Sequence, residues 1–344
     1  MMEKSDDNYI SVLNKDLSLP KEFDFTVLDL FAGCGGLSLG FEAAGFKSIG
    51  IEVDKDCCET YNKNLKGTCI NDFITKDYKF PYADVVIGGP PCQPFSVRGK
   101  QKGSNDSRNG FPAFVEAVRQ IRPKIWLVEN VRGLLYKNKE YLDSVIIELG
   151  KLGYFVEVKL INTSNFGVPQ NRERLIIVGH LGEFDFPKEH NKKVTAGDAL
   201  GELAKYYDSG SKFLTTNMDT YIAKYEKASK CIVPRDLHLH KPARTLTCRN
   251  LAGSTSDMHR LKLPDGRRRR LTVREAARLQ SFPDWFEFNG KETSQFNQIG
   301  NAVPPYFALQ IAKKIKYYLQ KPAKEVVFIP RPTIQSKIIT NSQI

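Results

Sequence analysis

The sequence predicts an α/β fold with a doubly wound, mostly parallel sheet, followed by a smaller and more polar domain. Between residues 24 and 180, short apolar runs typical of buried strands alternate with longer runs typical of helices. After residue 180 the chain becomes polar and irregular and rich in Lys, Asp, Ser and Arg, without any internal repeat. Ligands of a doubly wound sheet bind beyond the carboxyl ends of its strands, so functional residues are expected there.

The expected elements follow from these runs. The first strand lies at residues 26–31, and further strands are expected at 48–53, 68–70, 84–88, 125–129, 155–160 and 174–179. Helices are expected at residues 37–44, 111–121, 140–149 and 305–319. Thr272 and Glu275 have the spacing of a capping box, which predicts a helix that runs through Gln280. The predicted large domain spans 24–180 and is completed by 290–322; the small domain spans 181–289, with terminal extensions at 1–23 and 323–344.

Composition narrows the classes of partner. Lys and Arg number 51 against 39 Asp and Glu, and the net charge of +12 favours a polyanion such as nucleic acid. The seven cysteines contain no C-x-x-C pair, so we expect reduced thiols, with no metal site and no disulfide framework. The sequence shows neither an apolar signal core nor an apolar run of transmembrane length, so no membrane partner is expected.

A glycine-rich segment, residues 29–36, lies between the first strand and its helix. Its glycines allow a sharp turn and a close approach to a ligand, and the helix amino terminus attracts a carboxylate. The third glycine of a dinucleotide fingerprint is replaced by Ser38. Glu52, at the end of the next strand, could accept hydrogen bonds from ribose hydroxyls, and Asp72 from an adenine amino group. Each feature alone could be an ordinary turn or strand end; together they predict a nucleoside pocket.

A cysteine, Cys92, follows the strand at 84–88 within a proline-rich run, residues 90–96. A lone buried cysteine is usually structural, but the stiff approach through two prolines to a strand end favours a nucleophile. The residues from 93 to 110 have the glycines and cations of a mobile, phosphate-facing lid. Glu129 ends another strand, and Arg172 and Arg174 open the one after it, where alternate residues share a face.

These residue types suit the methylation of cytosine at C5. Addition of a thiolate to C6 makes C5 nucleophilic, a carboxylic acid can protonate or hydrogen-bond N3, and an arginine at O2 stabilises negative charge. A base must then remove the C5 proton before the thiolate leaves. In duplex DNA the cytosine must first be flipped out of the stack.

At this point the sequence resembles the bacterial DNA cytosine-5 methyltransferases of restriction–modification systems. The resemblance covers about residues 25–320. It rests on six ordered blocks, at residues 29–41, 88–96, 129–131, 170–174, 270–286 and 300–304. Six blocks in order are specific in a way that no single block is.

The resemblance implies the reaction and its residues. Cys92 would be the nucleophile, Glu129 would act at N3 and the exocyclic amine, Arg174 would contact O2, and Arg172 is a supporting candidate. The cofactor would be S-adenosylmethionine in a Rossmann-like domain. The residues implied to line its site are Phe31, Ala32, Gly33, Cys34, Gly35, Leu37, Glu52, Val53, Asp72, Phe73, Pro90, Asn301 and Ala302.

The resemblance also assigns residues 181–289 to target recognition, with duplex DNA as the partner. Arg249 and Asn250 can make bidentate contacts to guanine and adenine edges, whereas Arg267 and Arg268 are expected to contact phosphates. Further DNA contacts are expected from the segment that follows Cys92, at Gln93, Ser96, Arg98 and Lys100. A monomer in the bacterial cytoplasm that protects host DNA from a cognate endonuclease is the expected context.

Three alternatives remain open from the sequence. The substrate could be cytosine in RNA, because one branch of this superfamily methylates transfer RNA. The chain could be a non-catalytic DNA-binding relative, although such a protein would be expected to lose Cys92 or Glu129. A nicotinamide-dependent oxidoreductase is suggested only by the glycine-rich segment and leaves the Pro-Pro-Cys run unexplained.

Overall fold

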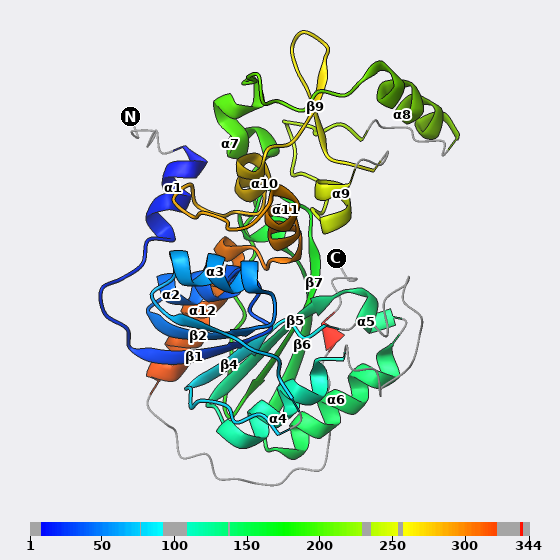
Figure 1. Cartoon of the computed structure of the whole chain (residues 1–344). Coiled ribbons are helices and arrows are strands. Elements are labelled where there is room, and N and C mark those ends of the chain that lie inside the picture. Colours follow the sequence, from blue (N-terminus) through cyan, green and yellow to red (C-terminus); the bar gives the residue numbers. More distant parts are fainter. Residues whose placement is uncertain are drawn as a thin grey trace.

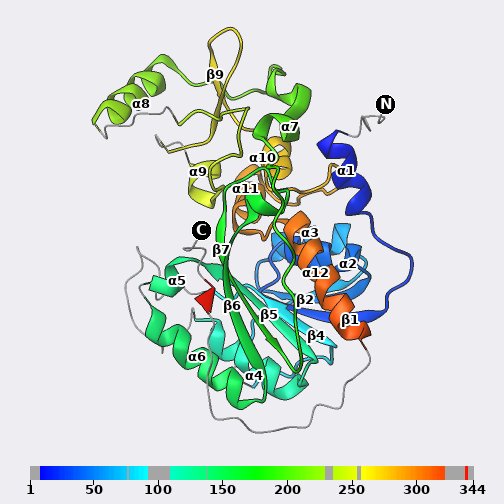
Figure 2. The same cartoon turned by 180° about the vertical axis from the view of Figure 1, so that it is seen from behind.

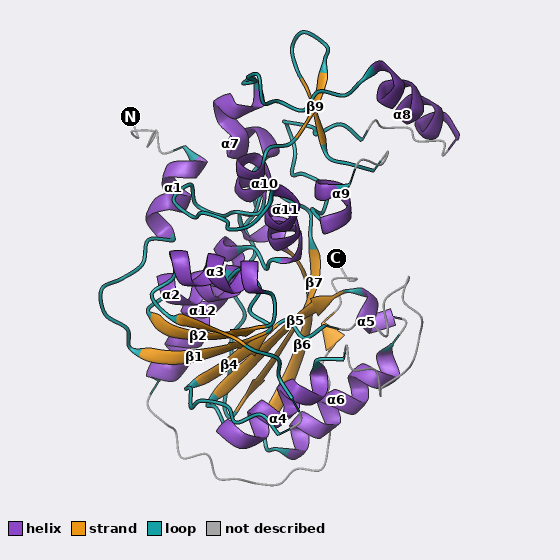
Figure 3. Cartoon of the chain, in the orientation of Figure 1, coloured by secondary structure: helices purple, strands orange, loops and turns teal. Residues whose placement is uncertain are grey.

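The centre of the molecule is one eight-stranded sheet (Figures 1 and 3). The computed structural model describes residues 8–75, 77–91, 109–136, 138–228, 235–253, 257–321 and 338–339. The strand order is β10-β6-β7-β5-β4-β1-β2-β3. The strands are β1 (Phe25–Leu30), β2 (Phe46–Glu52), β3 (Thr68–Asn71), β4 (Val85–Gly88), β5 (Ile125–Val131), β6 (Phe155–Asn162), β7 (Glu173–His180) and β10 (Ile338–Ile339). Neighbouring strands are parallel except at β7, which is antiparallel to β5 and β6. The predicted doubly wound, mostly parallel sheet is confirmed.

Helices cover both faces of this sheet (Figures 1 and 2). One face carries α2 (Gly36–Ala43), α3 (Lys55–Asn64) and α12 (Pro305–Gln320), and the other carries α4 (Phe111–Ile121), α5 (Gly133–Tyr136) and α6 (Lys139–Lys151). Successive strand residues point to opposite faces, so Val27 packs in the first apolar cluster and Leu28 in the second. The strands and helices that the sequence predicts begin and end within two residues of their expected bounds, whereas α3, α5 and β10 were not predicted.

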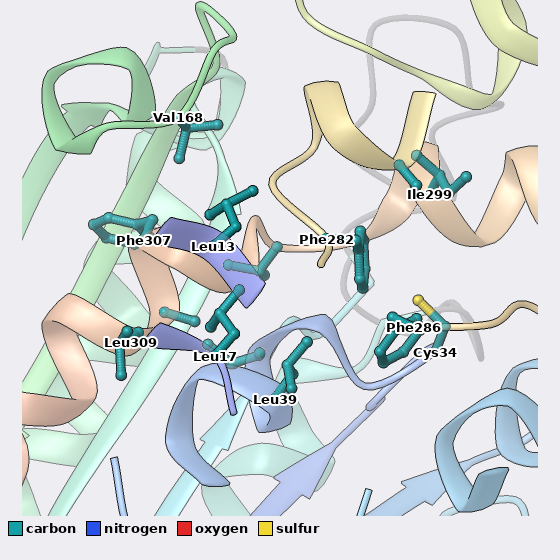
Figure 4. Packing of buried hydrophobic residues seen from close by; sticks show 14 of the residues in the cluster. Leu13, Leu17, Cys34, Leu39, Val168, Phe282, Phe286, Ile299, Phe307 and Leu309 are labelled. Carbon is teal, nitrogen blue, oxygen red and sulfur yellow. The ribbon is translucent and has the colours of Figure 1, made fainter. Parts of the chain in front are cut away.

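The first helix, α1 (Tyr9–Asp16), lies within residues 1–23, which the sequence predicts to be a terminal extension. Asn8 caps it by accepting a hydrogen bond from the Ser11 amide. Leu13 and Leu17 are fully buried and join the cluster around α2 and α12 (Figure 4). The segment therefore contributes to the core of the large domain.

The small domain lies beyond the carboxyl edge of the sheet, in the upper part of Figure 1. Its elements are α7 (Ala196–Leu200), η4 (Gly201–Ala204), α8 (Thr216–Ala228), α9 (Cys248–Ala252), β8 (Arg260–Lys262), β9 (Arg268–Arg270) and α10 (Val273–Leu279). The predicted capping box is confirmed, because the Glu275 amide donates to Thr272 and the Thr272 amide donates to the Glu275 carboxylate. Two remaining elements, η3 (Thr163–Phe166) and α11 (Glu292–Asn301), flank the junction between the domains.

The small domain contains buried, paired arginines besides its buried apolar residues. Arg260 is fully buried, and its guanidinium lies 2.5 Å from the Asp236 carboxylate and 2.6 Å from that of Glu226. Arg269 is buried against Glu275 at 2.6 Å. Charges removed from water are tolerated when each is paired and hydrogen-bonded in this way.

Candidate active site

The candidate site lies where the carboxyl ends of β1, β2, β4 and β5 meet. These strands are mutually parallel, so the segments that follow them emerge at the same edge of the sheet. The glycine-rich segment follows β1, Glu52 ends β2, and Glu129 lies near the end of β5. Pro90 and Pro91 follow β4 and lead to Cys92, which lies outside the described residues, as do Gln93, Ser96, Arg98 and Lys100.

The segment after β1 turns sharply in backbone conformations that favour glycine. The φ angles are +61° at Phe31, +54° at Gly33 and +87° at Gly35. A Cβ on Gly35 would lie 2.8 Å from the rings or methyl groups of Tyr61 and Leu65, whereas a Cβ on Gly33 would meet no atom within 4 Å. Gly35 is thus required for packing below the loop, and Gly33 faces open space.

Other residues of this segment point inward. Ala32, Cys34 and Leu37 are buried. Burial raises the pKa of the Cys34 thiol to about 12, so this thiol is a packing group and no nucleophile at neutral pH. Figure 4 shows Cys34 beside Phe282 and Phe286, which belong to the stretch after α10.

Glu52 lies at the edge of the predicted nucleoside site and accepts two backbone amides. One of its carboxylate oxygens accepts the Gly33 amide at 2.9 Å and the other accepts the Asp54 amide at 2.8 Å. A carboxylate oxygen has two lone pairs, so each can still accept a hydroxyl from a ligand. The neighbouring Val53 and Phe73 are 63% and 57% exposed, which leaves apolar surface available beside Glu52.

Asp72 lies close to Glu52 because β3 pairs with β2. Its amide donates to the Glu52 carbonyl at 3.1 Å, and its own carboxylate accepts the Phe73 amide at 2.8 Å. Glu52 and Asp72, the two residues predicted to bind a nucleoside, therefore lie next to each other at one edge of the sheet.

The residues that flank the Cys92 segment are fixed to one another. The Gly110 amide donates to the Pro91 carbonyl at 3.0 Å, and the Asn130 side-chain amide donates to the buried Pro90 carbonyl at 3.0 Å. A Cβ on Gly110 would lie 2.5 Å from Pro91 and 2.8 Å from Phe31. Pro91 and Gly110, on either side of the Cys92 segment, therefore lie between the glycine-rich segment and β5.

Glu129 and Arg174 form an ion pair that depends on the reversed direction of β7. Glu129 is opposite Ile176, so Arg174 lies two residues away on the same face of the sheet. Arg174 Nε is 2.8 Å from Glu129 Oε1, and the two side chains are only 13% and 11% exposed. This contact is not an aligned hydrogen bond, because Oε1 accepts none from the described residues. A Cβ on Gly89 would lie 3.6 Å from Glu129 Oε2, which places the pair next to the segment that leads to Cys92.

Arg172 points away from this pair and into the junction between the domains. Its guanidinium donates to the Leu246 carbonyl at 2.9 Å and twice to the Gly300 carbonyl, at 3.2 and 3.3 Å. It is 2% exposed, and burial lowers its pKa to about 9, so it stays charged at neutral pH. In this structure Arg172 braces the start of β7 against the small domain and α11.

Two glutamines at the same junction were not singled out by the sequence. Gln170 accepts the Leu246 amide at 2.9 Å and contacts Gln280, which donates to the carbonyls of Ile299 and Ala302, each at 2.8 Å. Asn301 is exposed beside them and accepts a hydrogen bond from the Cys248 thiol at 3.0 Å. Burial of amide side chains cannot be read from a polar sequence run, although both glutamines fall inside the blocks that carry the family resemblance.

The predicted DNA-contacting residues of the small domain have different environments. Asn250 is buried at the start of α9. Its side-chain oxygen accepts the Thr247 backbone amide, and its side-chain nitrogen donates to the Thr245 carbonyl. The side chain is buried and both ends of its amide are hydrogen-bonded, so a base contact would require these bonds to break and stays a prediction. Arg249, by contrast, is exposed at the surface of the same helix.

The arginines predicted to contact phosphates are both paired with carboxylates, Arg267 at the surface and Arg268 in a partly buried position. Arg267 lies 2.7 Å from Asp265 and stacks on the rings of Tyr207 and Phe213, at 4.6 and 4.4 Å from their centroids. Arg268 contacts the carboxylates of Asp219 and Asp236. A phosphate would have to compete with these partners, most of all at Arg268, so phosphate binding there stays a prediction.

Within the described ranges, no cluster of His, Cys, Asp or Glu has the geometry of a metal site. The same ranges contain no helix that is both long and apolar enough to cross a membrane.

The fold and the site define a member of the C-5 cytosine-specific DNA methylase family, whose sequence pattern matches residues 25–317. The chain belongs to this family, so the resemblance found in the sequence is confirmed. The chain is 53% identical to the type II methyltransferase M.AplI of Arthrospira platensis over 332 residues, which cover 94% of this chain and 96% of that protein. It is 36% identical to the type II methyltransferase M.NgoFVII of Neisseria gonorrhoeae, with 89% of each chain covered.

Solved structures support the fold. The Entamoeba histolytica methyltransferase EhMeth superposes with a TM-score of 0.67 at 17% identity, over 88% of this chain and 100% of that one. The Dnmt2 methyltransferase of S. pombe gives a TM-score of 0.65 at 17% identity, over 86% and 99%. The chain is thus a DNA cytosine methyltransferase with a Rossmann-like methyltransferase fold.

An enzyme of this family requires a methyl donor of the S-adenosylmethionine type, and the described residues fit one. The open face of Gly33 leaves room for a ligand against the backbone. The amino terminus of α2 has no side-chain cap, so its positive end is available to a carboxylate. Glu52 and Asp72 supply acceptors at the ends of the next two strands of the sheet, because β2 lies beside β1 and β3 lies beside β2.

Proposed function

We propose that the protein transfers the methyl group of S-adenosylmethionine to C5 of a cytosine within a specific duplex DNA sequence, using Cys92 as the nucleophile. The observation that carries this proposal is the buried Glu129–Arg174 pair, which lies beside the segment leading to Cys92. An acid and a cation held together at 2.8 Å match the two polar edges of one pyrimidine ring.

Each residue of the site has a separate role in this proposal. The Cys92 thiolate adds to C6, Glu129 holds a proton at N3 and accepts from the exocyclic amine, and Arg174 donates to O2. Arg172 contributes indirectly, because it fixes the start of β7 that carries Arg174. S-adenosylmethionine supplies an electrophilic methyl group. Gly33, Gly35 and the amino terminus of α2 would hold its amino acid part, and Glu52, Asp72 and Phe73 its nucleoside.

The DNA would be held between the two domains with the target cytosine flipped out of the stack. The net charge of +12 favours the duplex, and exposed Arg249 is the best-supported candidate for reading a base edge. By analogy with its type II relatives, the enzyme would protect bacterial DNA from a partner endonuclease in the cytoplasm. We expect it to act as a monomer, since each reaction engages one base.

The proposal is tested with the full chain, methyl-labelled S-adenosylmethionine and DNA from a host that lacks cytosine methylation. We expect label in duplex DNA, and bisulfite sequencing should map it to one cytosine of a fixed sequence. Cys92→Ala should abolish transfer, whereas Cys58→Ala, on α3 with its thiol directed to the Cys69 carbonyl, should retain it. Label in transfer RNA but not in duplex DNA would reject the proposed substrate.

A second measurement tests the covalent step. A duplex with 5-fluorocytosine at the mapped position should retain the protein through denaturing electrophoresis, because fluorine at C5 blocks the proton removal that releases the thiolate. An active enzyme that forms no such adduct would contradict the role of Cys92.

A further inference from the structure

Five buried polar side chains form a continuous chain directly beneath the glycine-rich segment. The chain joins β1, α2, α3 and β2 in the order Asp29, Ser38, Tyr61, Ser48 and Glu42. None of the five is more than 1% exposed. None of them takes a direct part in the proposed reaction, so their burial calls for a separate explanation.

The contacts along this chain all have hydrogen-bond lengths. Asp29 Oδ2 to Ser38 Oγ is 2.7 Å, Ser38 Oγ to the Tyr61 hydroxyl is 3.0 Å, and the Tyr61 hydroxyl to Ser48 Oγ is 2.6 Å. Ser48 Oγ to Glu42 Oε1 completes the chain at 2.5 Å. Four contacts between oxygen atoms therefore link two carboxyl groups through three hydroxyls.

The number of hydrogens does not match these contacts if both carboxyls are ionised. Each hydroxyl has one hydrogen to donate, so the three supply three hydrogens for four contacts. With Ser38 donating to Asp29 and Ser48 to Glu42, Tyr61 can donate to only one of the two serines. The remaining pair of buried oxygens would face each other without a hydrogen, which is costly away from water. A fourth hydrogen on one carboxyl completes the chain.

The two ends of the chain differ in how well they hold a negative charge. Glu42 also accepts the backbone amides of Lys66 and Gly67, at 2.8 and 2.7 Å, and such hydrogen bonds favour the ionised form. Burial is the main cause that raises the pKa of Asp29 to about 7; the nearby charge of Glu52 contributes to this rise, whereas the hydrogen bonds from Ser38 act in the opposite direction.

The groups around Asp29 give its charge no compensation. Glu52 at the end of β2 is acidic, and Cys34 of the glycine-rich segment and Tyr61 of α3 are neutral groups whose pKa values are raised by burial. No cation is paired with Asp29 among the described residues. The extra hydrogen therefore belongs at the Asp29 end.

We propose that Asp29 keeps its proton far above the pH at which an ordinary aspartate ionises, up to the neutral range, and that this proton completes a hydrogen-bond chain through Tyr61 to Glu42 that positions the glycine-rich segment. Tyr61 is the central positioning residue. Its ring lies 2.8 Å from the places where a Cβ on Gly35 or Gly50 would be, so any shift of the ring moves the backbone above it. At the other end of the chain, Glu42 holds the turn at Lys66 and Gly67 through their amides. This turn leads into β3, and Asp72 directly follows that strand. Loss of the proton breaks one link and loosens both sides of the pocket.

The proton itself is tested without cofactor or DNA. A protonated carboxyl group has a C=O stretching band separate from the amide bands, and infrared spectra of the wild type should show one that titrates near the pH where Asp29 ionises. Asp29→Asn should remove this band, because its amide supplies the fourth hydrogen permanently. Exposed Asp77→Asn should leave the band unchanged. A wild-type spectrum without a band that depends on Asp29 overturns the proposal.

Stability provides a second readout. The folded protein keeps a proton that an unfolded Asp, with its usual pKa of 3.8, has released. The folded-to-unfolded ratio of the wild type, relative to Asp29→Asn, should therefore fall by about tenfold per pH unit from about pH 4 to about pH 7 and then level off. If Asp29→Asn fails to fold at about pH 6, the amide has not replaced the proton and the proposal is wrong.

Tyr61→Phe distinguishes the effect of the hydrogen-bond chain on the ionisation of Asp29 from the effect of burial. It leaves Asp29 buried but removes two contacts and one hydrogen, so that two serine hydrogens serve two contacts and no extra proton is needed. The midpoint of the carboxyl band should then move to lower pH by about one unit or more. An unchanged midpoint would show that desolvation, and not the chain, holds the proton.

The effect on the cofactor pocket rests on the proposed function and is measured with S-adenosylhomocysteine, which lacks the sulfonium charge. Its dissociation constant should rise several-fold from about pH 6 to about pH 8.5 in the wild type and stay level in Asp29→Asn. No binding at any pH would contradict the proposed function but not the infrared result. Equal pH dependence in both proteins would contradict the positioning role.

Discussion

Arg172 provides a sharp test of how the two domains are joined. Its buried guanidinium donates three hydrogen bonds to only two acceptors, the carbonyls of Leu246 and Gly300. Arg172→Met keeps a long, flexible apolar stem and removes every donor. The Leu246 carbonyl in the small domain and the Gly300 carbonyl in α11 then remain buried without this partner.

The expected loss follows from the groups left unsatisfied. A buried carbonyl without its hydrogen bond costs about 1–3 kcal/mol, so two cost about 4 kcal/mol together. The substitution also removes the cost of burying a cation, which is large enough here to lower the pKa of Arg172 to about 9. This relief offsets part of the loss, and we expect a net decrease of about 2–3 kcal/mol in the free energy of unfolding.

Equilibrium unfolding in urea, without DNA or cofactor, measures this difference. Arg132→Met is the matched control, because Arg132 is 62% exposed, pairs with Glu173 at the surface, and should cost less than about 1 kcal/mol. If Arg172→Met has wild-type stability and still loses methyl transfer, Arg172 acts on the substrate and the bracing role is refuted.

Four further predictions concern other parts of the molecule. Glu129→Gln keeps the shape of the side chain but not its acid, so the single-turnover methylation rate should fall by about 10²–10⁴ at unchanged DNA affinity. Arg249→Ala should cost about 1–3 kcal/mol of sequence discrimination, measured by competition between target and altered duplexes. His259 is neutral in the folded protein because burial, assisted by nearby arginines, lowers its pKa to about 3. Between pH 6.5 and pH 3 only the unfolded state takes up a proton, so the free energy of unfolding should fall by about 2 kcal/mol at about pH 5. This loss should be absent in His259→Leu. Gly40→Ala places a Cβ 2.4 Å from the backbone of α12 and should cost about 1–3 kcal/mol by thermal unfolding, whereas Gly150→Ala, with open space around it, should not destabilise.

Each of these predictions has a contrary result. Full activity of Glu129→Gln would remove the acid from the mechanism, and unchanged discrimination by Arg249→Ala would move base reading elsewhere in the small domain. An acid slope that persists in His259→Leu would belong to other groups. Equal stability of the two glycine variants would mean that the close approach of α2 and α12 is relaxed in solution.

The sheet could be predicted because its strands are buried on both faces and appear as short apolar runs. The direction of β7 could not, since an antiparallel strand in the same layer has the same apolar content as a parallel one. This direction matters, because it places Arg174, at the start of its strand, beside Glu129, near the end of another. The sequence placed both at strand ends without giving the geometry that joins them.

Polar residues were harder to assign than apolar ones. Arg172 and Arg174 are spaced in the sequence like two residues on one face of a strand. Arg174 nevertheless pairs with Glu129, whereas Arg172 donates to a carbonyl at the domain junction. Asn250 has the side chain of a base reader but is used by the cap of α9. Only three-dimensional contacts decide whether such groups are already satisfied.

The packing of α12 against α2 has a consequence for biosynthesis. These helices are at opposite ends of the chain, and Gly40 meets the backbone of Ala308 and Leu309. The ribosome therefore completes α2 long before it makes the helix that supports α2 and the glycine-rich segment above it. A chain that ends before α12 would lack this support, and we expect it to lose the binding of its methyl donor.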